Sequence, residues 1–449
     1  MEFSFVFGCA FHRTLPFINT YWLMTDGGSQ RGLSVLYFGN RELSGEPVHA
    51  EVIDQAEIVW FGEVAPHFDP ANFSARLTGA FIPPETGAYT LGLTSVGRSR
   101  LLVDGVVLID DCDSFPGGSE RRITFDAIAG QSYSLQVEYA SQDGPHWRNL
   151  RIGCIPASPA DPIQEAASLA ARSDVAIVFA GLTKEWEGEG ADRPDMELPG
   201  MQAELIEKVA AANPRTIVVI SAGSPVSMGW LDQVGAVLQA WYLGQETGHA
   251  ITDVLFGDTN PSAKLPTTFP RRLQDTPTYI NYPGECGKVY YGEGIFVGYR
   301  YYDKKDIAPL FPFGFGLSYT SFEYSDLELS AAEYGPGDVV QVRLCIKNTG
   351  SRPGKEIVQV YLRDIESSLV RPEKELKAFA KVSLAPGEAR VVSLTLDKDA
   401  LAFYNPEQRI WVVEPGDFEV LVGSSSRDIH LKGRFAWKSQ VAGPSQAPV

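Results

Sequence analysis

The sequence has few basic residues and no long apolar stretch. Its 38 Lys and Arg are outnumbered by 56 Asp and Glu, which gives a formal net charge of −18 at pH 7. Acidic proteins repel the phosphate backbone of nucleic acids, and no stripe rich in Lys or Arg reverses this locally. No run approaches the ~20 apolar residues of a membrane span. We therefore expect neither a nucleic acid nor a membrane as partner, and a neutral small substrate fits better.

Cysteine is also scarce. The five cysteines, at positions 9, 112, 154, 286 and 345, are odd in number and far apart, and they form no CxxC motif. The sequence therefore indicates neither a disulfide framework nor a zinc site, and we expect no metal and no cofactor. The apolar residues 3–11 lack the basic n-region and the clear cleavage site of a secretory signal, which slightly favours the cytoplasm over secretion.

A chain of 449 residues is too long for one hydrophobic core, and a prior of about 100–200 residues per domain suggests three domains. Short alternating runs between turn residues predict two β-sandwiches, and alternating helices and strands between them predict a doubly wound α/β domain. The expected divisions are a ragged N-terminal segment (1–31), a β-sandwich (32–156), an α/β sandwich (157–320), a linker (321–334), an immunoglobulin-like β-sandwich (335–438) and a disordered tail rich in Ala, Pro and Ser (439–449).

The most informative stretch is residues 185–200, which hold six acidic residues, one arginine and three glycines. They follow residues 175–180, an apolar run typical of a buried parallel strand, and ligands of open α/β sheets bind beyond the carboxyl ends of such strands. An acidic loop on an acidic protein is commonly a solvated surface. However, Trp186 is costly to expose, and Asp192 with Arg193 can hold a neighbouring carboxyl group in place. We interpret the loop as half of an active site.

Several motifs occur in order along the chain. In the first sandwich they are GAYTL at 87–91 and RLLVDG at 100–105. Further on they are EGADR at 189–193 running to LPG at 198–200, WYLGQETG at 241–248, GDTNPSAKLP at 257–266, YGEGIFVGYRYY at 291–302, FPFGFGLSY at 311–319, NTG at 348–350 and PGDF at 415–418. Together they resemble the carboxyl-terminal part of a glycoside hydrolase family 3 enzyme of the β-glucosidase type. In that type a PA14 domain interrupts the α/β domain, and a fibronectin type III-like domain follows.

The resemblance implies a retaining glycosidase that releases terminal β-D-glucosyl residues with two carboxyl groups about 5–5.5 Å apart. In this family the α/β domain supplies the acid/base. Its motif falls on Glu189, with Glu187 as the fallback and Glu185 as a further alternative. Glu189 must then hold a proton through burial or a like-charged neighbour. For Asp192 and Arg193 we expect an ion pair that braces the loop rather than direct contact with the sugar.

The chain departs from the family because it lacks the (β/α)8 barrel that carries the nucleophilic aspartate. We therefore expect a fragment or truncated gene product that is inactive alone. Its substrates would be β-glucosides or short β-linked oligosaccharides, and its protein partner would be the missing barrel or a second copy of the chain. The alternative is a PA14 lectin-like protein that binds carbohydrate without catalysis. A PA14 insertion would narrow the aglycone side of the site and favour short substrates.

Other candidate residues have simpler explanations. We expect Tyr291, Glu293, Tyr299 and Arg300 to lie either around the site or, more simply, in a packed connector between domains. Trp241 is expected in the core, and His249 as a hydrogen-bonded structural histidine. The aspartates 110, 111 and 113 suggest a calcium site only weakly, because adjacent carboxylates in a loop are commonly solvated.

Overall fold

The computed structural model describes residues 2–25, 27–62, 64, 71–113, 120–143, 147–156, 161–190, 192–439 and 441–442, with only the backbone of 111–112 and 441–442. The chain divides into two units. The first comprises Met1–Asp192, Leu198–Val219 and Trp230–Leu238, and the second comprises Arg193–Glu197, Ile220–Gly229 and Gln239–Val449.

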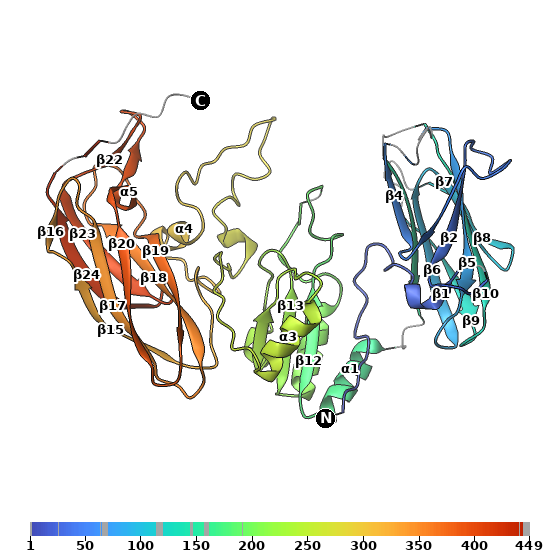
Figure 1. Cartoon of the computed structure of the whole chain (residues 1–449), viewed down its shortest axis with the longest axis horizontal. Helices are drawn as coiled ribbons and strands as arrows, with labels where there is room; N and C mark the ends of the chain where they lie inside the picture. The colour runs from blue at the N-terminus through green and yellow to red at the C-terminus, as the bar shows by residue number, and fades with distance from the viewer. Residues whose placement is uncertain are drawn as a thin grey trace. The chain divides into compact units, whose positions relative to one another are not determined.

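Within the first unit, two antiparallel sheets form a β-sandwich (Figure 1). One sheet has the order β3 (His49–Ile53), β2 (Leu33–Phe38), β5 (Ser74–Phe81), β10 (Tyr133–Ala140), β7 (Arg98–Val103) and β8 (Val106–Cys112), with β1 (Leu23–Met24) paired to β5. The other has the order β4 (Glu57–Phe61), β11 (Trp147–Ile155), β6 (Gly87–Val96) and β9 (Arg121–Ala127). Alternate residues point inward, and the rings of Tyr37, Trp60, Phe73 and Tyr139 pack together in the core.

Residues 15–24 of the predicted ragged segment pack into the first sandwich. Leu15, Ile18 and Leu23 are buried, and the Ile18 amide donates to the Ile152 carbonyl over 3.0 Å. A short 3-10 helix, η1 (Thr20–Trp22), then leads into β1. The sequence does not predict this packing, because these apolar residues follow neither the helical nor the strand period and give no local signal.

The α/β part contains α1 (Pro162–Ala171), β12 (Ala176–Gly181), α2 (Gln202–Ala212), β13 (Thr216–Ser221), β14 (Ala236–Gln239) and α3 (Thr247–Phe256). Figure 1 labels α1, β12, β13 and α3. The sheet order is β12-β13-β14. The Gly235 amide donates to the Thr216 carbonyl, and the Ala240 amide donates to the Ile220 carbonyl. Because the residue numbers of both partners increase in the same direction, β13 and β14 are parallel. Asp161 caps α1 by accepting from the Gln164 amide.

Strand β12 is buried on only one face, although the sequence predicted a fully buried strand. Val178 and Ala180 are buried. Val175, just before the strand, is 45% exposed, Ile177 38% and Phe179 62%. The described residues therefore leave an apolar sheet face uncovered, which is costly for a sheet of this type.

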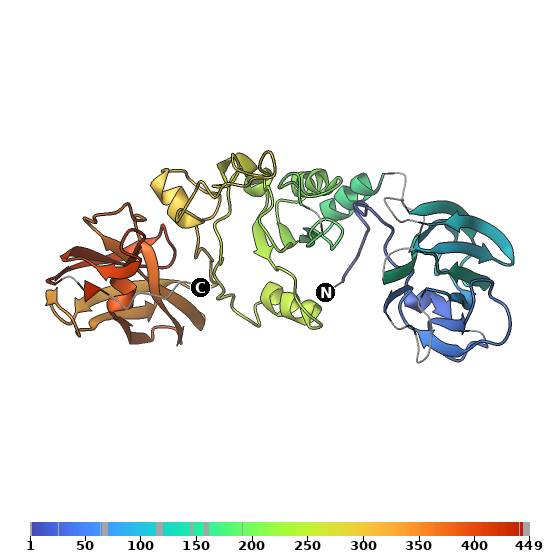
Figure 2. The ribbon, with the colours of Figure 1, turned by 90° about the horizontal axis from the view of Figure 1, so that it is seen from above.

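The second sandwich lies in the second unit and is seen from above in Figure 2. One sheet has the order β15 (Phe322–Leu329), β17 (Val340–Asn348) and β20 (Ala389–Leu396). The second has the order β16 (Glu333–Tyr334), β24 (Ile429–Trp437), β23 (Gly416–Gly423), β18 (Gly354–Asp364) and β19 (Glu375–Leu384). The smaller elements are α5 (Lys398–Leu401), β21 (Phe403–Asn405), β22 (Ile410–Val413) and β25 (Val441–Ala442).

The predicted linker 321–334 instead contains β15 and β16. Strand β15 pairs with β17 but shifts register between Ser325 and Glu328, and Asp326 adopts a φ of 55°. This bulge breaks the two-residue alternation by which a strand is read from sequence. No helix in the described ranges combines the length and apolar character needed to cross a membrane.

Candidate active site

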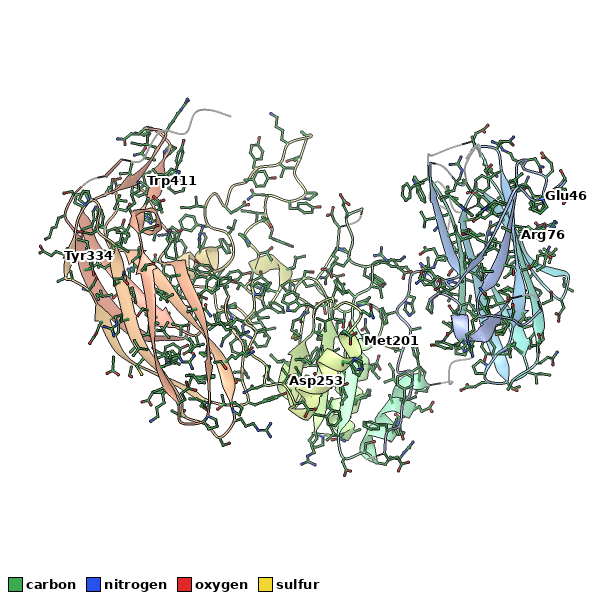
Figure 3. All side chains as sticks on the ribbon, in the orientation of Figure 1. Glu46, Arg76, Met201, Asp253, Tyr334 and Trp411 are labelled. Carbon is green, nitrogen blue, oxygen red and sulfur yellow. The ribbon has the colours of Figure 1, made fainter. Side chains whose placement is uncertain are left out.

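One buried glutamine holds together the two ends of the acidic loop, which comprises residues 185–200. Gln202, on the first turn of α2, is 2% exposed. Its Oε1 accepts from the Gly181 amide over 2.8 Å, while its Nε2 donates to the carbonyls of Gly181 and Pro199 over 3.0 Å each. The end of β12 and the start of α2 are thereby held together. Met201, labelled in Figure 3, marks the point where the loop enters the helix.

Glu185 is held by residues from the N-terminal segment and from β11. Its carboxylate accepts from the Arg13 amide over 3.0 Å and from the Thr14 hydroxyl, and it pairs with the Arg151 guanidinium over 3.4 Å. The side chains of Glu185 and Arg151 are only 12% and 11% exposed. These contacts indicate a structural carboxylate. Sequence reasoning missed Arg13 and Thr14, because more than 170 positions separate them from Glu185.

Trp186 is covered by the same segment. Its indole Nε1 donates to the Phe11 carbonyl over 2.8 Å, and the Arg13 guanidinium lies 4.1 Å from the ring centroid. Gly200, at the other end of the loop, has a φ of 67°, and an added Cβ there would meet Phe11 at 3.0 Å. Nearby, burial lowers the pKa of His12, so this imidazole is neutral at pH 7. Residues 10–14 therefore hold the loop at both ends.

Glu187 and Glu189 lie past this anchored part. Glu187 is half-buried and makes an interaction within the protein. Glu189 is exposed, and its carboxylate forms no hydrogen bond or ion pair with the part of the chain that the structure describes. The oxygens of Glu189 are thus not engaged within the described residues, whereas those of Glu185 are.

Arg193 belongs to the second unit and contacts the segment after β13. Its Nη1 donates to the Ser224 hydroxyl over 2.9 Å and to the Pro225 carbonyl over 3.3 Å. In the same unit, the Ser227 amide donates to the Met196 carbonyl over 2.7 Å. Arg193 therefore ties its segment to Ser224 and Pro225. The predicted pairing with Asp192 stays a prediction.

The four residues expected either around the site or in a connector between domains divide into two groups. Tyr299 and Arg300, in α4 (Tyr299–Lys304), contact β19: the Tyr299 hydroxyl accepts from the Leu376 amide over 2.8 Å, and Arg300 pairs with Glu375 over 3.2 Å. This is the packed connector that the simpler explanation predicts. Tyr291 is 82% exposed, and Glu293 has a buried Oε2 without a hydrogen bond to the described residues.

Trp241 and His249 each contact a neighbouring side chain. Trp241 is half-buried against Phe269, and His249 is exposed and lies 2.6 Å from Glu246 Oε2. Within the described ranges, no group of three or more His, Cys, Asp or Glu side chains could hold a metal. The suggested calcium site depends in part on Asp111, whose side chain lies outside the described residues.

Comparisons with known proteins agree with the motifs. Residues 54–319 match the glycosyl hydrolase family 3 C-terminal domain, and residues 356–426 match a fibronectin type III-like domain. A β-glucosidase from Rhizobium radiobacter is 42% identical over 88% of this chain and 50% of its own length. The thermostable β-glucosidase B of Acetivibrio thermocellus is 54% identical over 60% of this chain and 36% of its own.

Solved structures give the same result. The crystal structure of a β-glucosidase from Kluyveromyces marxianus in complex with glucose superposes with a TM-score of 0.90 at 37% identity. It covers 98% of this chain, while the chain covers 54% of that protein. The chain therefore spans about half the length of the proteins from Rhizobium radiobacter and Kluyveromyces marxianus.

Proposed function

The chain belongs to glycosyl hydrolase family 3, and from this premise we propose that it supplies the acid/base side of a retaining β-glucosidase site, with Glu189 as the acid/base. The observation that carries the proposal is the state of the three glutamates. Glu185 is bound to Arg13, Thr14 and Arg151 as part of the fold. Glu189 stands in the family motif on an anchored loop, exposed and unengaged within the described residues.

Glu189 would act twice. In the first step its protonated carboxyl group donates a proton to the glycosidic oxygen as the bond to the anomeric carbon breaks. In the second step its carboxylate takes a proton from the water that hydrolyses the glycosyl-enzyme. The nucleophile that forms this intermediate would come from a barrel domain outside these 449 residues. Because Glu189 is exposed here, its desolvation would also depend on a domain that covers the loop.

The exposed face of β12 supports a site that is shared between this chain and a barrel domain. Ile177 and Phe179 lie on the strand that leads into the acidic loop, and both are exposed. An apolar sheet face beside a candidate site is typical of a surface that another polypeptide covers. We therefore propose that the chain alone does not turn over substrate. From the family, we propose that the substrates of the complete site are β-glucosides or short β-linked oligosaccharides.

The test combines the chain with a barrel domain produced from a full-length relative. The chain alone should not hydrolyse an aryl β-glucoside, and the mixture should. In the mixture, Glu189→Gln should lower kcat on cellobiose roughly 10²–10⁴-fold, the usual contribution of acid–base catalysis. The loss should be smaller on a dinitrophenyl β-glucoside, whose leaving group needs no proton. Glu197→Gln, an exposed carboxylate in the same loop, is the matched control and should change kcat less than about threefold.

Three results would contradict the proposal. Turnover by the chain alone would remove the need for a barrel. A larger loss in Glu187→Gln than in Glu189→Gln would move the acid/base to Glu187. Glycan binding by the first sandwich, with no activity in the mixture, would favour the lectin-like alternative.

We also propose that the first sandwich is a PA14-like insertion that favours short substrates. The structure shows how to delete it: residues 16–24 belong to the sandwich through β1 and the contacts of Ile18, so the deletion should run from residue 16 to residue 156. In the active mixture, the deletion should raise the rate on longer oligomers relative to cellobiose. An equal chain-length preference before and after deletion would contradict this role.

A further inference from the structure

The second unit contains a cavity of about 350 Å³. It is lined by residues from 193–196, from 224–225 after β13, and from 267–302. Its size falls within the range typical of small-molecule sites, which have mostly apolar walls and a few polar groups. The apolar wall is formed by Met196, Pro225, Pro270, Leu273 and Pro277. All of the lining residues belong to the second unit, so the cavity needs neither the first unit nor a barrel.

Three residues that line this cavity carry a hydrogen-bond donor without a partner among the described residues. Arg193 uses Nη1 for Ser224 and Pro225, but its Nη2 is buried and unbonded. Thr268 is 5% exposed and its buried Oγ1 forms no hydrogen bond. A buried donor left unsatisfied is costly, so two of them on residues around one cavity, Arg193 Nη2 and Thr268 Oγ1, indicate a place where a ligand accepts hydrogen bonds.

Tyr302, on α4, is the third donor. It is 3% exposed, lines the cavity, and its hydroxyl bonds to none of the described residues. Burial raises the pKa of Tyr302, so the hydroxyl keeps its proton and remains a donor throughout the working pH range.

We propose that this cavity binds a small monocarboxylate with an apolar or aromatic body. A guanidinium and two hydroxyl groups suit an oxyanion, which accepts hydrogen bonds and carries negative charge. The carboxylate of Asp195 also lines the cavity and would repel a second negative charge, which disfavours phosphate and other dianions. The proline, methionine and leucine side chains would cover the rest of the ligand.

The experiment measures binding to the full chain by calorimetry and ligand-observed NMR, with three probes. Benzoate should bind saturably. Benzyl alcohol, which keeps the ring and loses the charge, should bind at least about tenfold more weakly, and inorganic phosphate should not bind measurably. Tyr302→Phe and Thr268→Val each remove one unbonded hydroxyl and should weaken benzoate binding by about tenfold. Tyr301→Phe changes the neighbouring tyrosine, which does not line the cavity, and should leave benzoate binding unchanged.

The proposal is overturned if benzoate fails to saturate by roughly 10 mM, a concentration at which binding would have no useful strength. It is also overturned if benzyl alcohol or phosphate binds as tightly as benzoate, or if both cavity variants bind benzoate like the unmodified chain. Because the measurement needs no turnover and no barrel, its outcome is separate from the test of Glu189.

Discussion

Glu185 shows that a carboxylate in an acidic loop can serve the fold rather than the chemistry. It joins the loop to Arg13 and Thr14 in the N-terminal segment and to Arg151 on β11. Removing one partner of a buried ion pair leaves the other charge uncompensated. We expect Glu185→Gln to lower the free energy of unfolding of the first unit by about 2 kcal/mol, because glutamine keeps one acceptor but loses the charge. Denaturant titration followed by circular dichroism measures this difference.

The neighbouring Lys184 provides the control for Glu185. It pairs with Glu57 over 3.4 Å, but its side chain is 66% exposed. Exposed pairs contribute little, so Lys184→Gln should change the free energy of unfolding by less than about 0.5 kcal/mol. Equal effects of the two substitutions would show that the Glu185 contacts do not stabilise the loop.

The cysteines should differ sharply in reactivity. Burial raises the pKa of Cys154 from 9.0 to about 12, whereas Cys286 is exposed. Only the thiolate reacts, so at pH 8 iodoacetamide should label Cys286 while Cys154 in the folded chain stays unlabelled, which peptide mass spectrometry can read out. Since the pKa of Cys154 is raised on folding, its contribution to stability is complete below pH 9 and is lost as the pH rises toward 12. Labelling of Cys154 as fast as Cys286 would contradict its burial.

The three glutamates also mark the limit of what sequence alone could decide. The motif placed the acid/base in this loop, but residues two positions apart in a loop have no local pattern that separates them. The contacts that commit Glu185 to the fold come from Arg13 and Thr14, far away in the chain and in a segment without a recognisable period. The choice of Glu189 over Glu187 stays a prediction.

At the level of elements, Glu375 links the connector to the second sandwich. Its carboxylate on β19 pairs with Arg300 of α4 over 3.2 Å, with Arg371 over 3.2 Å and with Lys377 over 3.5 Å. Burial alone would raise the pKa of Glu375, but Lys377, Arg300 and Arg371 together lower it from 4.5. A lowered pKa in the folded state means that the stabilisation is present above pH 4.5 and is lost as the pH falls.

We therefore expect Glu375→Gln to destabilise the second unit by about 2 kcal/mol at pH 7. The difference from the unmodified chain should shrink as the pH falls below 4.5, because the unmodified carboxylate then loses its charge. Urea unfolding between pH 3 and pH 7 measures this trend. Glu328→Gln removes a carboxylate that is 71% exposed, on β15, and should leave the profile unchanged. A destabilisation by Glu375→Gln that is the same at all pH values would contradict the electrostatic explanation.

Strands could be predicted where one face is buried and the alternation is regular. Strands β2 and β13 are of this kind, since apolar residues dominate both and most of them are buried. Strands such as β3 and β9 give a weaker signal. They lie at sheet edges, where exposed charged side chains such as those of Glu51, Arg121 and Arg122 interrupt the pattern. The sequence also gave no sign that one face of β12 is uncovered, because apolar residues look the same whether or not a partner covers them.

At the scale of the whole molecule, the two sandwiches have separate hydrophobic cores. One core is built around Tyr37, Trp60 and Phe73 in the first unit, and the other around Val360, Phe418 and Trp437 in the second. Domains with their own cores can unfold as separate cooperative units. The chain spans about half the length of the β-glucosidases from Rhizobium radiobacter and Kluyveromyces marxianus.

We therefore expect calorimetry of the chain to show two unfolding transitions, each assignable by a substitution already described. Glu185→Gln should lower only the transition of the first unit, and Glu375→Gln only that of the second, each by about 4–8 °C for a loss of about 2 kcal/mol. Benzoate should raise only the second transition, because a ligand stabilises the unit that binds it and its cavity lies wholly in the second unit. A single transition that both substitutions lower equally would mean that the two units unfold together. In that case the cavity and the acidic loop would share one cooperative fold, and a ligand in the cavity would stabilise the loop as well.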